Sequence, residues 1–330
     1  MSKKHDIIWL QSVDSTNEEA KRHISDIDNL SVLSAWEQTA GRGQRGNKWT
    51  SNAGENLMFS IVLKSPVLMA EDHFALNEIA ALSVSEFLST YGIKAQIKWP
   101  NDIYVDEKKI CGILIENSFR GKSISSSIIG IGLYINQRIF NVNIPNPTSM
   151  VLCRAEDGPL DIHRCLEEFM DIFTSLHDRF LSSACDISPL RQSYLSSLWR
   201  SGKPSRFIDY TFLPGGHLDG PMNICTGKVH DTGIPSSDHS GNEFPGMIRG
   251  QSPTGNLLVE DLSTDRSVNS ASKRSDISSD VFQCAAQSPD TQGVRHPLVG
   301  KLPHLQRGNH LITNHLDNTS KEIIISMTSR

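Results

Sequence analysis

Residues 95–116, AQIKWPNDIYVDEKKICGILIE, decide the fold, because turn signals divide this stretch into three short apolar segments. Pro100 interrupts the first segment, and the polar Asp106-Glu107-Lys108 turn precedes the third. Short apolar segments bounded by such residues are typical of β-strands. The predicted strands lie at 95–99, 103–105 and 109–116. The centre of the chain is therefore expected to be a sheet.

The segments on either side mix further strands with helices. Alternating apolar residues predict strands at 6–11, 31–37, 56–64 and 125–135. An N-cap signal at Ser15-Thr16-Asn17, followed by acidic residues, predicts a helix through about Ile27. Apolar residues on one face at a 3.6-residue period predict helices at 72–91, 162–180 and 188–198. Because strands and helices do not alternate strictly, we predict an α+β fold with a mixed sheet rather than a doubly wound parallel sheet.

After Gly202 the chain changes to short strands, predicted at 205–211, 246–250 and 256–260. The last two flank Gln251-Ser252-Pro253-Thr254-Gly255, where proline and glycine favour a hairpin turn. These strands predict a small β-barrel, which a strand at 322–327 would close.

The aromatic residues locate the well-packed part of the chain. Of the 22 Phe, Trp and Tyr residues, 20 lie at or before Phe212. Since aromatic side chains dominate core burial, the densely packed body must end near there. We therefore predict one domain at 1–200 and a second at 201–330. Inserts at 212–242 and 264–320 carry too few large apolar residues to offset their ordering entropy, which predicts that they are disordered.

Composition excludes several classes of protein. The 32 Lys and Arg against 37 Asp and Glu give a net charge of 32 − 37 = −5, which argues against nucleic acid or an anionic membrane as the main partner. No apolar run approaches the about 20 residues that a membrane helix needs, and no secretory signal is visible. The six cysteines form no C-x-x-C pair. We expect a cytoplasmic protein that binds neither DNA nor membrane.

The segment Gly41-Arg42-Gly43-Gln44-Arg45-Gly46 matches the G-x-G-x-x-G dinucleotide fingerprint literally. That fingerprint requires a following helix to bind pyrophosphate, but the loop-like residues 47–54 follow, so the Rossmann interpretation fails. What remains is a glycine loop with Arg42, Arg45, Lys48 and Trp49, which could fold over a nucleotide phosphate. A solvated basic loop explains the composition equally well.

A second group of candidates lies in the central sheet. The strand at 95–99 delivers Lys98, and Asn101-Asp102 could hold magnesium or a ribose. Lys109 begins the next strand, in which Gly112 permits close approach of a ligand. A hairpin with surface lysines remains an alternative for these residues. Two glycines in an apolar strand, Gly130 and Gly132, indicate either a ligand against the backbone or tight packing.

Five motifs occur in order along the chain: Ser15-Thr16-Asn17, Gln38-Thr39-Ala40-Gly41-Arg42-Gly43, Trp49, Lys98-Trp99-Pro100-Asn101-Asp102 and Lys109-x-x-Gly112-Ile113-Leu114-x-Glu116. In this order and spacing they resemble the biotin protein ligases, biotin–[acetyl-CoA-carboxylase] ligases, over about residues 5–262. The resemblance implies a catalytic domain followed by a small SH3-like barrel. It also implies the monofunctional type, because the first motif begins at Ser15 and leaves no room for the DNA-binding domain of some relatives.

The resemblance implies a reaction in two steps. The carboxylate of biotin attacks the α-phosphate of ATP, which releases pyrophosphate and leaves biotinyl-5′-AMP. A lysine amine then attacks the acyl carbon and expels AMP. The implied ligands are ATP, biotin and Mg²⁺, and the implied partner is the biotin carboxyl carrier domain of a biotin-dependent carboxylase. The expected assembly is a monomer or a homodimer.

The same resemblance implies roles for individual residues. The biotin-binding residues are Ser15, Thr16, Asn17, Gln38, Arg42, Gly43, Gln44, Lys109, Gly112 and Gly130. The ATP-binding residues are Arg45, Trp49, Asn101, Asp102 and Tyr134, with Asp102 also the Mg²⁺ ligand. The catalytic residues are Lys109, Arg42 and Lys98. Two positions depart from the family pattern: Gln44 replaces an arginine of many relatives, and Tyr134 replaces an asparagine, so that it either stacks on adenine or obstructs it.

Two alternatives remain open. One is a lipoate or octanoyl ligase of the same fold, although the segments at 38–43 and 98–102 favour biotin. The other is a non-catalytic protein that binds biotin or biotinyl-AMP, as Tyr134 and the interrupted C-terminal barrel could indicate. Biotin-dependent ATP–pyrophosphate exchange separates these alternatives from the ligase.

Overall fold

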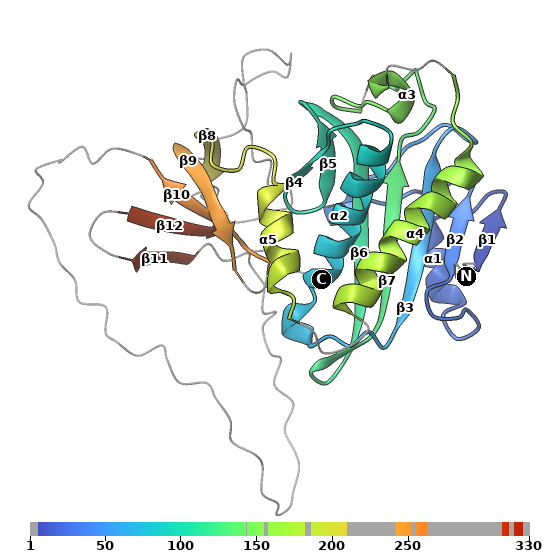
Figure 1. Cartoon of the computed structure of the whole chain (residues 1–330), viewed down its shortest axis with the longest axis horizontal. Helices are drawn as coiled ribbons and strands as arrows, with labels where there is room; N and C mark the ends of the chain where they lie inside the picture. Colours follow the sequence, from blue (N-terminus) through green and yellow to red (C-terminus); the bar gives the residue numbers. More distant parts are fainter. Residues whose placement is uncertain are drawn as a thin grey trace, which may run out of the picture.

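The computed structural model describes residues 6–142, 144–154, 158–181, 186–209, 242–252, 255–262, 312–316 and 320–325. It contains a seven-stranded sheet and a five-stranded sheet (Figure 1). The strands of the first are β1 (Ile7–Leu10), β2 (Val32–Ala35), β3 (Leu57–Lys64), β4 (Gln96–Lys98), β5 (Asp102–Val105), β6 (Lys108–Arg120) and β7 (Ser123–Leu133). Those of the second are β8 (Ser205–Asp209), β9 (Asn242–Gln251), β10 (Leu257–Asp261), β11 (Ile312–Leu316) and β12 (Ser320–Ile325).

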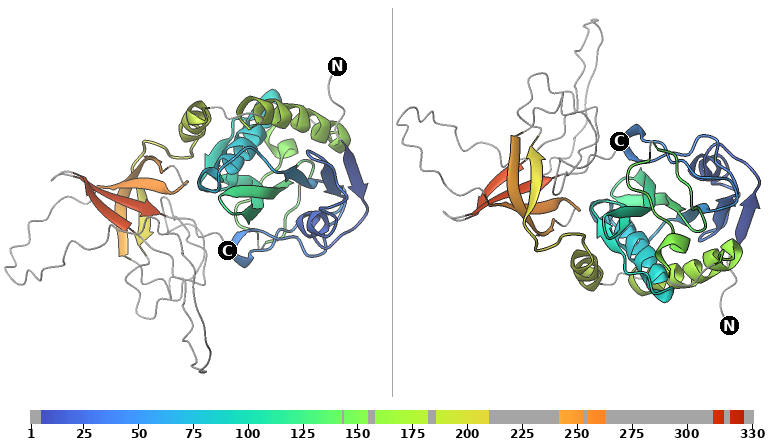
Figure 2. Two further views of the ribbon diagram at one scale, coloured as in Figure 1. Left: turned by 90° about the horizontal axis from the view of Figure 1, so that it is seen from below. Right: turned by 90° about the horizontal axis from the view of Figure 1, so that it is seen from above.

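The seven-stranded sheet is mixed, as predicted for an α+β fold. Its order is β1-β2-β3-β7-β6-β5-β4, in which β1 and β2 pair in parallel and the other neighbours pair antiparallel. The helices are α1 (Thr16–Arg22), α2 (Ala75–Thr90), α3 (Met150–Cys153), α4 (Ile162–Phe180) and α5 (Ser188–Ser196). Figure 2 shows α2 and α4 together over one face of this sheet and α1 on the other. None of the described helices is long and apolar enough to cross a membrane.

Alternation along the strands assigns their side chains to two faces. In β3, Phe59 and Ile61 are buried in the main core, where Phe59 packs edge-on against Phe169 of α4 at 5.2 Å between ring centroids. Val62 instead belongs to a smaller apolar cluster with Ala20 of α1. The main core thus lies between the sheet and α2 and α4, which leaves the α1 face available for polar groups.

Most predicted elements of the first sheet are confirmed within a few residues, and the differences have local causes. The first helix ends at Arg22 rather than Ile27, although Ile27 remains buried in the smaller cluster and so continues the apolar period. Strand β6 extends to Arg120 because it pairs with β7 from Cys111 to its end. The four-residue helix α3 was not predicted.

The five-stranded sheet is antiparallel, in the order β11-β12-β10-β9-β8. Strand β12 confirms the predicted final strand, shifted to Ser320–Ile325. Ile312–Leu316, within the predicted insert 264–320, form β11 and pair with β12. Residues 264–311 and 317–319 of that insert, and residues 212–241 of the other, lie outside the described residues.

Glu78, in the first turn of α2, is a fully buried carboxyl group. Burial raises its pKa to about 7, although the hydrogen bond from Gln251 Nε2 at 2.6 Å and the charge of Arg191 act to lower the pKa, and Asp72 adds to the increase. A carboxyl group with a raised pKa in the folded state stabilises the fold fully only below its unfolded pKa, near 4.5. That contribution is lost as the pH rises through about 7.

We therefore expect Glu78→Gln to become more stable, relative to the unchanged protein, as the pH rises from 5 to 8. The difference in the free energy of unfolding should change by about 3 kcal/mol across this window, since each unit of pKa shift corresponds to about 1.4 kcal/mol. Urea unfolding of both proteins at several pH values measures this difference, in which the titration of all other groups cancels. A difference that is independent of pH would contradict the prediction.

Candidate active site

A cavity lies on the α1 side of the seven-stranded sheet, where the site residues predicted from the sequence come together. All ten predicted biotin-binding residues line it: Ser15, Thr16, Asn17, Gln38, Arg42, Gly43, Gln44, Lys109, Gly112 and Gly130. Trp49, Lys98, Asn101 and Asp102 also line it, whereas Tyr134 does not. The side chain of Arg45 lies outside the described part of the chain. Residues more than 100 positions apart thus share one wall.

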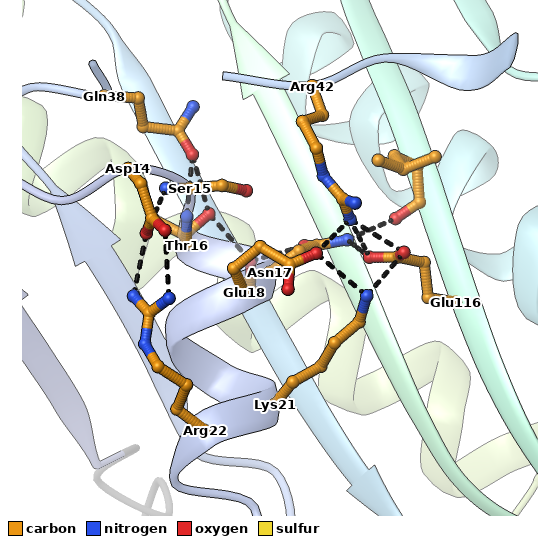
Figure 3. A network of polar contacts seen from close by, with 12 residues as sticks. Asp14, Ser15, Thr16, Asn17, Glu18, Lys21, Arg22, Gln38, Arg42 and Glu116 are labelled. Atoms are coloured by element: carbon orange, nitrogen blue, oxygen red, sulfur yellow. Dashed lines mark hydrogen bonds and ion pairs between the residues drawn. The ribbon is translucent and has the colours of Figure 1, made fainter. Parts of the chain in front are cut away.

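One end of the cavity is a buried hydrogen-bond network at the start of α1. Gln38 Oε1 accepts hydrogen bonds from the Thr16 backbone N–H at 2.8 Å and from Thr16 Oγ1 at 3.2 Å. Ser60 Oγ of β3 lies 2.7 Å from Thr16 Oγ1 and 2.6 Å from Asn17 Oδ1. Asn17 Nδ2 donates to Glu116 Oε2 at 2.8 Å (Figure 3). Because these groups are already oriented, they form a polar wall suited to a small neutral ring with amide-like donors and acceptors.

Two members of this network were not assigned as site residues from the sequence. Ser60 interrupts the apolar β3 sequence Leu57–Lys64, and Glu116 follows the apolar run Ile113-Leu114-Ile115. A single polar residue in a buried strand is the signal that could have identified Ser60, because such a residue needs a partner. Glu116 carries no such signal, since the polar Asn117 and Ser118 follow it.

Glu116 joins three elements around the cavity. Its carboxylate accepts from Lys21 Nζ of α1 at 2.7 Å and from Arg42 of the glycine loop at 2.7 Å, in addition to Asn17 (Figure 3). Although burial acts to raise the pKa of Glu116, hydrogen bonds from Lys21, Asn17 and Arg42 hold it below its ordinary value. Arg42 also pairs with Glu18 at 2.7 Å. The ionised Glu116 therefore fixes both Asn17 and the glycine loop.

The other end of the cavity carries the two lysines. Lys109 Nζ forms an ion pair with Asp102 Oδ1 at 2.6 Å. The backbone of Lys109 is held on its far side, since its N–H donates to Asn146 O at 2.8 Å and its carbonyl accepts from the Thr148 N–H at 2.9 Å. Lys98 Nζ lies 4.8 Å from the centroid of the Tyr104 ring. Two cations beside one carboxylate leave this end net positive, as an anionic ligand requires.

Trp49 covers the strands between the two ends. A Cβ atom on Gly132 would lie 2.3 Å from Trp49 Cε2, and one on Gly112 would lie 3.2 Å from Trp49 Cζ3. The indole ring therefore rests on the bare backbone of β6 and β7, which only glycine allows. Of the two explanations for Gly132 left open by the sequence, tight packing against a side chain is the one observed.

Tyr134 is placed differently from the sequence prediction. Its ring stacks on Trp49, with centroids 4.6 Å apart, and its hydroxyl donates to the Thr50 carbonyl at 2.9 Å. The side chain is 2% exposed and does not line the cavity. Tyr134 therefore lies against Trp49 and supports that ring, and its contact with adenine stays a prediction.

Comparisons with known proteins identify the family to which this fold belongs. A sequence model of the biotin/lipoate A/B protein ligase family matches residues 9–133. The biotin–[acetyl-CoA-carboxylase] ligase of Paracoccus denitrificans is 31% identical over 202 residues, which are 59% of this chain and 82% of that protein. The bifunctional ligase/repressor BirA of Escherichia coli K12 is 31% identical over 138 residues, 42% of this chain and 43% of that protein. The chain thus spans less than half the length of that ligase/repressor.

A solved structure extends the similarity. The biotin protein ligase from Aquifex aeolicus in complex with biotin and ATP superposes with a TM-score of 0.57 at 25% identity, covering 78% of this chain and 95% of that one. The α+β fold described above is thus that of a biotin protein ligase. This chain belongs to the biotin protein ligases.

Proposed function

We propose that this chain is an ATP-dependent ligase that activates biotin as biotinyl-5′-AMP and transfers it to a lysine of a biotin carboxyl carrier domain. The observation that carries this proposal is one cavity with a neutral hydrogen-bonding end and a cationic end. Biotin has a neutral ureido ring and an anionic carboxylate, and ATP brings further negative charge to that carboxylate. The two ends match the two parts of the reacting pair.

Biotin binds with its ureido ring against the network at the start of α1. Ser15, Thr16, Asn17 and Gln38 supply the donors and acceptors, and each of the first three is 3% exposed. Gly130 leaves room for this arrangement, since a Cβ atom there would lie 2.2 Å from Asn17 Oδ1. Arg42, Gly43 and Gln44 lie over the bound ligand, and Gly112 lets it approach β6.

Catalysis follows from charge at the cationic end. The biotin carboxylate attacks the α-phosphorus, the bond to the bridging oxygen breaks, and pyrophosphate leaves with the electron pair. Lys109, together with Arg42 and Lys98, stabilises the negative charge that gathers where carboxylate and phosphate meet. In the second step the acceptor lysine amine attacks the acyl carbon, loses a proton, and expels AMP. Trp49 and the glycine loop exclude water from the anhydride between the two steps.

ATP binds beside Trp49, which covers the adenine side, with Arg45 and Asn101 near the nucleotide and Tyr134 behind the indole. The chain fits Mg²⁺ in a limited way: among the described residues no group of three His, Cys, Asp or Glu side chains could hold a metal ion. A single carboxylate, Asp102, suits an ion held mainly by substrate phosphates. When bound, Mg²⁺ would neutralise phosphate charge.

The wider setting extends the proposal. The acceptor is the carrier domain of a biotin-dependent carboxylase, and the enzyme works in the cytoplasm as a monomer or homodimer, without DNA or membrane as a partner. The chain divides into a catalytic domain at 1–200 and a C-terminal domain at 201–330. The five-stranded antiparallel sheet supports an SH3-like barrel for the second domain.

Biotin-dependent ATP–pyrophosphate exchange tests the first half-reaction directly. We expect radiolabelled pyrophosphate to enter ATP when the purified chain is given biotin and Mg²⁺, and not when lipoate replaces biotin. Exchange with lipoate instead would identify a lipoate-type ligase. Biotin binding without exchange would identify a non-catalytic binding protein and overturn the proposal.

A further inference from the structure

The tip of the β9–β10 hairpin contacts the cavity wall from the C-terminal sheet. The Gly255 carbonyl accepts a hydrogen bond from Trp99 Nε1 at 3.0 Å. Trp99 is 8% exposed and belongs to the segment Lys98–Asp102, every residue of which lines the cavity. A backbone atom 156 positions away along the chain therefore holds the middle of this segment.

The fit of this tip is tight at Gly255. Its φ is +86°, and a Cβ atom there would lie 2.2 Å from Cγ of Phe74, the residue before α2. Both the positive φ and the lack of room for a Cβ atom therefore require glycine at this position. Leu257, which follows the tip, is fully buried in the same main core as Phe74. The hairpin is therefore packed into the first sheet's core rather than resting on its surface.

Polar contacts fix the tip and the segment to one helix. Gln251 Nε2, at the end of β9, donates to Glu78 Oε1 of α2 at 2.6 Å. Asn77, the preceding residue of α2, donates from Nδ2 to the Pro100 carbonyl at 2.5 Å, and Tyr194 Oη of α5 donates to the same carbonyl at 2.9 Å. Trp99 and Pro100 are thus held from two sides, by the hairpin and by the helices.

We propose that the tip of the β9–β10 hairpin, Gln251 and Gly255, positions the Lys98–Asp102 segment for the ATP half of the reaction. This inference rests on the proposed function, in which Lys98 and Asp102 serve the phosphates and Asn17 and Gln38 serve biotin. The hairpin contacts the segment of Lys98 and Asp102 through Trp99, and its described residues form no hydrogen bond to Asn17 or Gln38. Its loss therefore weakens ATP use and leaves biotin binding unchanged.

The test replaces Gly255 by alanine and compares it with Gly121→Ala. Gly121, in the β6–β7 turn, also has a positive φ, +63°, but a Cβ atom there meets nothing within 4 Å. Both variants place alanine at a positive φ, and only Gly255→Ala adds the collision with Phe74. We expect Gly255→Ala to raise the KM for ATP in pyrophosphate exchange about tenfold, a loss of about 1.4 kcal/mol. The Kd for biotin alone should stay within about twofold, and Gly121→Ala should change neither.

A second variant guards against misfolding of Gly255→Ala. Trp99→Phe removes the indole N–H but keeps an aromatic ring, and it should raise the KM for ATP by several-fold without changing the biotin Kd. Together the two substitutions should cost less than the sum of their separate effects, because both remove one contact. Equal losses of ATP and biotin affinity in both variants, or full additivity, would show that the hairpin only stabilises the fold.

The outcome is separable from that of the proposed function. If the unchanged chain gives no exchange, calorimetric titration of ATP into the biotin-saturated protein replaces the KM, and the same contrast between Gly255→Ala and Gly121→Ala applies. Unchanged ATP affinity in Gly255→Ala overturns the positioning role, whether or not the chain is catalytic. A chain that binds no ATP overturns both.

Discussion

Replacing Lys109 by alanine is expected to slow biotin-dependent ATP–pyrophosphate exchange by about 100- to 1,000-fold, a loss of about 3–4 kcal/mol of transition-state stabilisation. Lys109 extends from β6 into the cationic end of the cavity, where it forms an ion pair with Asp102. The two reacting groups are both anionic and repel each other. We expect the ammonium group of Lys109 to offset most of this electrostatic repulsion. Initial rates at saturating biotin and ATP measure the effect.

The matched control for this prediction is Lys108→Ala. Lys108 precedes Lys109 in the same strand and has the same charge, but it is exposed and does not line the cavity. Its replacement should leave the exchange rate within about twofold, since surface charges contribute little. Adenylation that survives in Lys109→Ala at nearly the unchanged rate would show that another group carries the chemistry.

The second large effect is expected on substitution of two glycines of β7. Replacing Gly130 should weaken the use of biotin, and replacing Gly132 should weaken the use of ATP. In Gly130→Ala the new methyl group would lie 2.2 Å from Asn17 Oδ1, so Asn17 must leave its hydrogen bonds to Ser60 and Glu116. In Gly132→Ala the methyl group would displace Trp49 instead. We expect Gly130→Ala to raise the KM for biotin by roughly 30- to 100-fold, about 2–3 kcal/mol, because buried hydrogen bonds to a charged partner are lost.

Gly132→Ala should raise the KM for ATP by about tenfold and change the KM for biotin much less, since it disturbs only the aromatic cover. Each variant thus serves as the control for the other, because both place one methyl group on the same face of one strand. Exchange kinetics with one substrate varied and the other saturating give the four constants. If both variants raised the KM for biotin and the KM for ATP to the same extent, the two ends of the cavity would not be distinct.

How far the sequence predicts the fold depends on the kind of signal. Strands such as β3 and β7 follow from apolar alternation, and α4 follows from its apolar period and from Asp161, whose side chain caps it by accepting from the His163 and Arg164 N–H groups. The helix end at Arg22 could not be predicted, because Ile27 keeps the apolar period going beyond the helix. Strand β11 was not predicted, because it forms by pairing with β12 and its own composition does not indicate a strand.

The site was predictable where residues stand in motifs and unpredictable where tertiary contacts decide. The cavity contains the predicted biotin-binding residues, since each came from an ordered motif. The stacking of Tyr134 on Trp49 could not be predicted, because the strand sequence gives no sign that Trp49 would lie over it. Ser60 was not predicted as a site residue, because its partners Thr16 and Asn17 are 44 and 43 positions away, beyond any local pattern.

The two faces of β3 and β7 have a consequence for how such a protein can change over time. Phe59 and Ile129 point into the main core, whereas their neighbours Ser60 and Gly130 border the Asn17 network. One surface of the sheet must satisfy packing volume, and the other must satisfy the outline of a bound molecule. Mutations can therefore accumulate on the first surface without altering which molecule is accepted, and new specificities can arise on the second without repacking the interior. Along each of these strands, residues that maintain the fold therefore alternate with residues that determine which ligand binds.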